Sequence, residues 1–146
     1  NFERASLNDA DMGSITIKES SFIDARLHNT KLTGSTLTDV CMKGTKLSGC
    51  NFIGATLSGV DFTAAEIKRC NFGSAAVIDV NLSRTILTPD VYSLYRTAEK
   101  LKVDSSFLIQ LLEQINVSSS DNPAIEALMV EIKKLLSKHV VGFLME

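Results

Sequence analysis

The sequence predicts a mainly β fold, a solenoid of stacked four-sided coils, followed by a short helical tail. Three observations lead to this prediction. A large apolar residue recurs every five positions from Phe2 to Leu87 without a break. A second residue, mostly small, stands two positions before each of these from Ala5 to Thr85. After Leu87 the apolar residues change to helical spacing.

The large apolar series has eighteen members: Phe2, Leu7, Met12, Ile17, Phe22, Leu27, Leu32, Leu37, Met42, Leu47, Phe52, Leu57, Phe62, Ile67, Phe72, Val77, Leu82 and Leu87. A period of five fits neither the 3.6 residues of a helical turn nor the two-residue period of a strand, so the chain must turn a corner in every repeat. Four sides close a square coil, in which the large residue and the small residue before it point inward. Stacking the coils then buries a continuous core. Glycines such as Gly49 and Gly54 follow the core positions, where the backbone must bend tightly.

Two segments show the repeat most clearly, Cys50-Asn51-Phe52-Ile53-Gly54 and Val60-Asp61-Phe62-Thr63-Ala64. They resemble the A(D/N)LXX signature of the pentapeptide-repeat family. The resemblance covers residues 1–87 and implies a right-handed quadrilateral β-helix with four repeats per coil, about 4.5 coils in all. The sequence departs from the signature in one respect, because the residue before the large apolar one is often Thr or Lys instead of Asp or Asn.

Residues 88–146 are expected to form a helical cap and the start of a following helical region. Helices are predicted near 90–102, 105–116 and 123–141 from their apolar spacing. The first is expected to cover the last coil, because a bare coil exposes unpaired strand backbone. Since the chain begins inside the repeat pattern and ends in an apolar stretch, we also expect it to be a piece of a longer protein.

Composition narrows the class of function. The chain has a net charge of -2, with 45% hydrophobic and 22% charged residues, which is typical of a soluble globular protein and excludes a strongly basic nucleic-acid binder. It shows neither a signal peptide nor an apolar segment long enough to span a membrane. The expected partner is therefore another protein, with no nucleic acid or membrane, and the expected state is a monomer. Its expected compartment is the bacterial cytoplasm or, for a secreted protein, the host cell.

No catalytic residue, cofactor or metal site is predicted. His28 and His139 have no nucleophile or carboxylate arranged around them by the repeat. Cys50 and Cys70, twenty positions apart, should stack in neighbouring coils with Cα atoms about 5 Å apart. We expect these two thiols to stay reduced, because parallel stacked side chains do not offer the torsion of a disulfide. Cys41 should face outward.

Reading every twentieth residue as a column sorts the outer surface into faces. One face is basic, and its candidate contact residues are Arg26, His28, Lys46, Lys68 and Arg69. The next face is poor in charge, and its candidates are Lys31, Asn51 and Ile53. A flat face with little charge is suggestive of partner binding.

These observations favour a non-catalytic recognition module. The order of a β-helix followed by helices resembles the SopA-like secreted effectors, bacterial ubiquitin ligases, and this resemblance implies a substrate-recognition role, with a HECT-like ligase lobe and its catalytic cysteine beyond Glu146. The alternative is a DNA mimic that protects gyrase, a function also found in the pentapeptide-repeat family. Against it, residues 1–87 carry nine basic and nine acidic residues, whereas DNA mimicry requires a strongly acidic surface.

Overall fold

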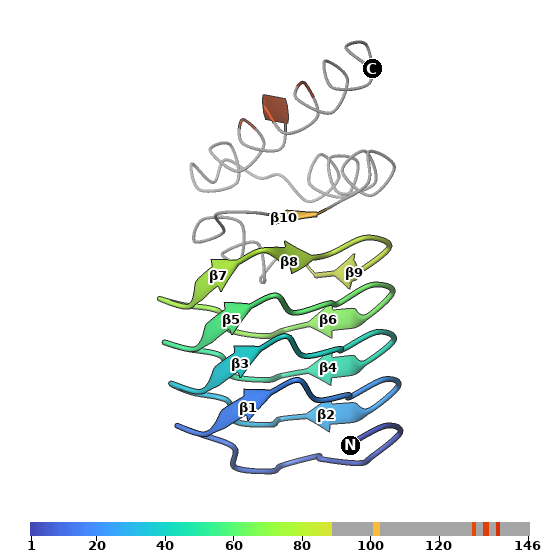
Figure 1. Ribbon diagram of the computed structural model, residues 1–146, viewed down its shortest axis with the longest axis vertical. Helices are drawn as coiled ribbons and strands as arrows, with labels where there is room; N and C mark the ends of the chain where they lie inside the picture. Colours follow the sequence, from blue (N-terminus) through green and yellow to red (C-terminus); the bar gives the residue numbers. More distant parts are fainter. Residues whose placement is uncertain (89–100, 103–129, 131–132, 135–136, 138–146) are drawn as a thin grey trace. The chain divides into compact units, whose positions relative to one another are not determined.

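The computed structural model describes residues 1–88, 101–102, 130, 133–134 and 137 of the 146-residue chain. Residues 1–102 form one compact unit and residues 103–146 a second. The first unit is a parallel β-solenoid of about four turns (Figure 1), as the five-residue period predicts.

Two opposite sides of the solenoid are regular parallel sheets, which stand as two columns of arrows in Figure 1. We call the side made by β2 (Arg26–His28), β4 (Lys46–Ser48), β6 (Glu66–Lys68) and β9 (Ile86–Leu87) face 1. Face 3 is made by β1 (Thr16–Lys18), β3 (Thr36–Thr38), β5 (Thr56–Ser58) and β7 (Ala76–Ile78). In both sheets each residue pairs with the residue twenty positions later, so four five-residue repeats make one turn.

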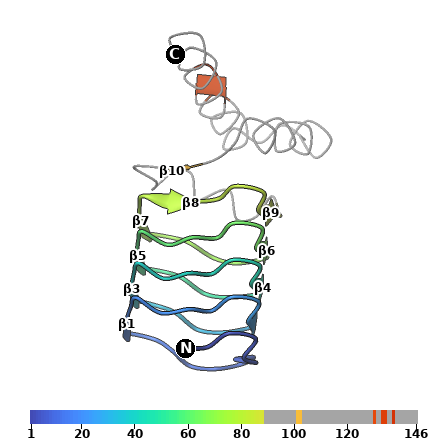
Figure 2. The same cartoon turned by 45° about the vertical axis from the view of Figure 1, so that its right-hand side comes forward.

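The other two sides are held by single bridges, except at β8 (Val80–Asn81) on the last turn, and the turned view shows the chain running across between the sheets (Figure 2). Face 2 contains the bridges that join Asp11, Lys31, Asn51 and Asn71. Face 4 contains those that join Ser21, Cys41, Asp61 and Asn81. In most turns of these two faces the backbone carbonyl of the large apolar residue accepts a hydrogen bond from the N–H three residues later. Phe52, for example, accepts from the Ala55 N–H at 2.9 Å. The faces therefore alternate between strand and tight turn.

The sequence distinguishes the two kinds of face. On faces 2 and 4 the residue before the large apolar one is often Asp or Asn, and its side-chain oxygen accepts the N–H two residues later, as Asn51 does from Ile53 at 2.9 Å. The same bond is made by Asn1, Asp11, Asp61, Asn71 and Asn81. Face 3 has Thr at that position in three of its four strands, and β-branched residues favour extended backbone. Asp and Asn before the large apolar residue thus mark turn repeats, although Ser21, Lys31 and Cys41 hold the same place on faces 2 and 4.

The core is formed by the two inward series that the period predicts. From Phe22 to Leu87 every large apolar residue of the series is buried, and so is every small residue from Ala25 to Thr85. Where the small residue is polar, its hydroxyl donates to a backbone carbonyl, as Ser35 does to Leu32 at 2.7 Å. Buried hydroxyl groups are tolerated when they are hydrogen-bonded in this way. In the first turn, which has a neighbouring turn on one side only, Phe2 and Ile15 remain 36% exposed.

The end of the predicted helix at 90–102 is wrong. Leu101 and Lys102 form strand β10 (Leu101–Lys102), which pairs in parallel with β8 (Val80–Asn81). The physical reason is the open edge of the last turn: a strand supplies hydrogen-bond partners to β8, which a helix lying over the edge does not. Residues 90–100 of that helix lie outside the described residues.

The rest of the predicted tail is only partly within the described residues. The helix predicted at 105–116 lies outside them. Inside the range 123–141, Val130, Lys133, Lys134 and Ser137 have helical backbone, and the Ser137 hydroxyl donates to the Lys133 carbonyl at 2.9 Å. The three-helix tail stays a prediction. Among the described residues, no helix has the length and apolar character to cross a membrane.

Candidate interaction surface

The five basic-face candidates project from face 1, as the twenty-residue columns predict. In the sheet, Arg26 is the Cα partner of Lys46, and Lys46 is the partner of Glu66. The second outward column runs from His28 through Ser48 to Lys68. The strands therefore hold these side chains at the inter-strand spacing of about 4.8 Å.

Only part of the positive charge on face 1 is neutralised within the described chain. Lys68 forms an ion pair with Glu66, at 3.1 Å between Nζ and Oε2. Arg69 donates from Nη2 to the Ser48 hydroxyl at 3.3 Å, a bond that leaves its charge in place. Arg26 and Lys46 have no ion pair with a described carboxylate. Arg26 and Lys46 repel one another across neighbouring strands, while Lys46 also faces Glu66 on the strand beyond it.

Two of the three candidates on face 2, Lys31 and Asn51, lie in one column with Asp11 and Asn71, and Ile53 lies two residues after Asn51. Lys31 lies 3.5 Å from Asp11, between Nζ and Oδ2, with both side chains about two-thirds exposed. The Gly13 N–H, and secondarily the Lys31 ammonium, hold the pKa of Asp11 below its ordinary value. Such an exposed ion pair is weak because water screens it.

Asn51 on face 2 is half-buried and carries a side-chain amide. Its side-chain oxygen already accepts the Ile53 N–H at 2.9 Å, and Asn71 in the next turn is engaged in the same way by the Gly73 N–H at 2.9 Å. The remaining polar group of each side chain is the NH₂, which is a donor only. Ile53 itself is 39% exposed, and Gly73 in the next turn leaves its outer side free of a large neighbour.

Faces 1 and 2 adjoin, and the corner between them brings the two sets of candidates together. Asn29, Gly49 and Arg69 occupy this corner in successive turns, each with a positive φ. Gly49 has no side chain, so the Asn29 amide folds over it, and a Cβ at position 49 would lie 2.6 Å from Asn29 Oδ1. We call the outward side chains of residues 26–31, 46–51 and 66–71 the corner band. It contains every predicted contact residue except Ile53, which borders it.

Ser48 and Asn71 belong to the corner band but were missed from the sequence. The signal for Asn71 was present, since it stands twenty residues after Asn51 with the same neighbours. Ser48 could not be found in this way, because it belongs to the band through the hydrogen bond that it accepts from Arg69 in the next turn.

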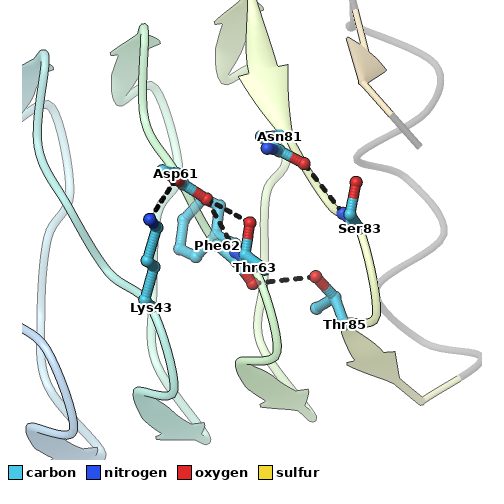
Figure 3. A network of polar contacts seen from close by, with 7 residues as sticks. All are labelled: Lys43, Asp61, Phe62, Thr63, Asn81, Ser83 and Thr85. Carbon is cyan, nitrogen blue, oxygen red and sulfur yellow. Dashed lines mark hydrogen bonds and ion pairs between the residues drawn. The ribbon is translucent and has the colours of Figure 1, made fainter. Parts of the chain in front are cut away.

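Face 4 offers a contrast, because its polar groups satisfy one another (Figure 3). Asp61 lies 3.6 Å from Lys43, between Oδ2 and Nζ, and accepts both the N–H and the hydroxyl of Thr63. In the next turn Asn81 accepts the Ser83 N–H at 2.9 Å. Lys43 and Asp61 on this face are therefore already paired with each other.

The cysteines lie where the repeat predicts. Cys50 and Cys70 are buried free thiols, whose sulfur atoms lie 2.7 Å from the Leu27 carbonyl oxygen and 3.3 Å from that of Lys68. The hydrogen bond with Cys70 lowers the pKa of the Cys50 thiol, and burial opposes this effect. Cys41 is half-buried on face 4. Among the described residues, no three His, Cys, Asp or Glu side chains gather around a point that could hold a metal ion.

Comparisons with known proteins agree with this geometry. The family model described as pentapeptide repeats matches the chain with eight copies, over residues 1–39, 10–49 and 45–84. No curated protein sequence matches the chain.

The solved structure of HetL has the same kind of fold. HetL, a pentapeptide repeat protein involved in heterocyst differentiation regulation in the cyanobacterium Nostoc, is 24% identical with a TM-score of 0.56, over 69% of this chain and 45% of HetL. Rfr23, a pentapeptide repeat protein from the cyanobacterium Cyanothece, is 24% identical with a TM-score of 0.44, over 70% of this chain and 58% of Rfr23. QnrB1, a plasmid-mediated fluoroquinolone resistance protein, is 17% identical with a TM-score of 0.42, over 82% of this chain and 72% of QnrB1. The chain thus spans about half the length of the first two. Since the family match extends over more than half of its residues, the chain belongs to the pentapeptide-repeat family.

Proposed function

We propose that the solenoid is a non-catalytic recognition module that binds another protein through the corner band. The observation that carries this proposal is the placement of exposed donors on two adjoining faces of a rigid scaffold. Arg26 and Lys46 have no ion pair with a described carboxylate, and the Asn51 side-chain oxygen is occupied by the Ile53 N–H, which leaves the NH₂ as its donor. Groups on regular strands are already ordered, so a partner binds them at little cost in conformational entropy.

A narrower proposal makes the module the substrate-recognition part of a secreted effector ubiquitin ligase. Its support is the order along the chain, a β-helix followed by sequence with the apolar spacing of helices. In that case the partner is a host protein, and recognition and catalysis are separate parts of the full protein.

The alternative function, a DNA mimic that protects gyrase, is disfavoured by charge. Duplex DNA carries a negative charge about every 1.7 Å along its axis, so a mimic needs a dense acidic surface. Residues 1–87 have no net charge, and the corner band has five basic residues against Glu66 alone. This distribution supports protein recognition.

Site-specific photocrosslinking tests the proposal. Ser48 and Ser58 are a matched pair, because each is a half-buried serine at the end of a three-residue strand, β4 on face 1 and β5 on face 3. A photoreactive amino acid replaces one or the other, and the purified protein is irradiated in host and bacterial lysates. We expect a discrete protein adduct from position 48 and none from position 58.

Two results would contradict the proposal: equal adducts from both positions, or none from either. Identification of the adduct also separates the two candidate functions. Gyrase crosslinked at position 48, together with protection of its supercoiling activity from a fluoroquinolone, would establish the mimic in place of the recognition module.

A further inference from the structure

The corner band has a strong local charge on a protein that has almost none overall. Its three segments, residues 26–31, 46–51 and 66–71, carry Arg26, Lys31, Lys46, Lys68 and Arg69 against Glu66, a net charge of +4. Residues 1–87 as a whole carry nine basic and nine acidic residues, and the whole chain has a net charge of -2. Positive charge is thus concentrated on these three turns, whereas the first turn of the same corner, residues 6–11, carries Asp9 and Asp11.

The ion pairs within the chain leave much of this charge available. The Lys31–Asp11 and Lys68–Glu66 pairs join side chains that are all more than one-third exposed, so they are screened and easily exchanged for other partners. Arg26 and Lys46 stand next to each other in the sheet with no described carboxylate in ion-pair range. A bound anion would relieve the repulsion between them.

The hydrogen-bonding groups of the band, like its charges, favour an anionic ligand. The side-chain oxygens of Asn51 and Asn71 are occupied by backbone N–H groups, which leaves their NH₂ groups as donors. Guanidinium, ammonium and amide NH₂ groups all donate and do not accept. A ligand complementary to the band therefore brings acceptors, and carboxylates satisfy both the charge and the hydrogen bonds.

We propose that the corner band binds an acidic segment of the partner protein, a stretch rich in Asp or Glu. This inference rests on the proposed function and names the chemistry of its partner. Because the donors repeat in successive turns at the spacing of about 4.8 Å, a segment lying along the solenoid axis meets a basic or amide group in each turn. Arg26 and Lys46 supply the main electrostatic attraction, and Asn51 and Asn71 add hydrogen bonds on the adjoining face.

A nucleic acid is a poorer match to the same surface. The band is confined to three turns, and other faces carry carboxylates such as Asp39 and Asp79, which repel a long polyanion. A short acidic peptide segment needs no more than the length of the band. We therefore use nucleic acid as a competing ligand in the test.

The test measures binding of a fluorescently labelled oligoglutamate by anisotropy, with oligoglutamine and a single-stranded oligonucleotide of equal charge for comparison. The double variant Arg26→Gln/Lys46→Gln removes two charges from the band. The control Lys18→Gln/Lys43→Gln removes two charges from faces 3 and 4. Oligoglutamate should bind the unaltered protein, and we expect an affinity about tenfold lower for the band variant and little changed for the control, since exposed charges contribute modestly to binding. Thermal unfolding checks that both variants keep the fold.

Equal losses in the two variants would overturn the proposal, because the effect would then come from net charge alone. So would equal binding of oligoglutamine, tighter binding of the oligonucleotide, or no binding of oligoglutamate. If position 48 still crosslinks a protein while oligoglutamate does not bind, only the acidic nature of the partner is refuted. If both fail, the recognition function is refuted as well.

Discussion

Asn81 in β8 and Lys102 in β10 are Cα partners in parallel strands, although twenty-one residues separate them. Everywhere else in the solenoid the offset between paired strands is twenty. The chain therefore leaves the five-residue repeat after face 1 of the last turn and returns in strand form to face 4. The compact unit ends at Lys102 for this reason.

A chain that ends at Leu87 should become oligomeric or insoluble, whereas a chain that ends at Lys102 should remain monomeric with somewhat lower stability than the full protein. The shorter chain lacks β10, so the backbone of β8 becomes an open edge that can pair with another molecule. Size-exclusion chromatography with light scattering on the two chains measures the difference. A well-behaved monomer ending at Leu87 would mean that β10 does not protect the edge.

Phe52→Ala should destabilise the protein far more than Ile53→Ala. The Phe52 side chain is fully buried and stacks on Phe72 with ring centroids 4.6 Å apart, so its removal leaves a cavity and should cost about 3 to 5 kcal/mol. Ile53 is 39% exposed, and its truncation should cost about 1 kcal/mol or less. Denaturant titration of both variants gives the two values. Similar losses in the free energy of unfolding would mean that the residue pointing into the core differs by one position from the one observed.

The register of the core could be predicted from the sequence because it depends on a local pattern that repeats without interruption. Each large apolar residue has the same neighbours in the turns above and below, so every repeat reinforces the same assignment. The alternation of strand and turn faces was also encoded, in the choice between Asn51 or Asp61 on one kind of face and Thr36 or Thr56 on the other. The five-residue period alone does not reveal this alternation, because it treats all four sides as equivalent.

The position of β10 and the content of the corner band could not be predicted in this way. Strand β10 pairs outside the period, and the apolar spacing around Leu101 equally fits a helix; the need of β8 for a partner decides the outcome. The residues that make up the corner band depend on which columns adjoin at a corner and on the direction in which their long side chains point. Arg69 donates to the Ser48 hydroxyl of the preceding turn, a relationship between turns that no single column contains.

All three cysteines should titrate as free thiols in denaturant, and only Cys41 should react quickly in the native protein. Cys50 and Cys70 are 1% and 2% exposed, so a reagent cannot reach them while the core is closed, although the hydrogen bond with Cys70 lowers the pKa of Cys50. Reaction with a chromogenic disulfide before and after denaturation gives the two counts. A single thiol in denaturant would reveal a disulfide between Cys50 and Cys70.

The last prediction concerns the corners, where backbone conformation and side-chain contacts can be separated. Gly54 and Gly49 have φ values of +66° and +70°, in the left-handed region that costs a residue with a Cβ about 1 to 2 kcal/mol. A Cβ at Gly54 would meet no atom within 4 Å, so Gly54→Ala measures the backbone cost alone, about 1 kcal/mol after the entropy of glycine is considered.

Gly49→Ala should cost more, by about 0.5 to 1.5 kcal/mol, because the new Cβ displaces the Asn29 amide and breaks its hydrogen bond to Asp9 Oδ1, which measures 3.2 Å. The reverse substitution Ala64→Gly, at a φ of 58°, should stabilise the protein by about 0.5 to 1 kcal/mol and serves as the control for sign. Thermal and denaturant unfolding of the three variants give the free energies. Equal losses of stability in Gly54→Ala and Gly49→Ala would show that Asn29 contributes nothing to the corner between faces 1 and 2. A larger loss in Gly49→Ala would show that the Asn29 amide stabilises this corner.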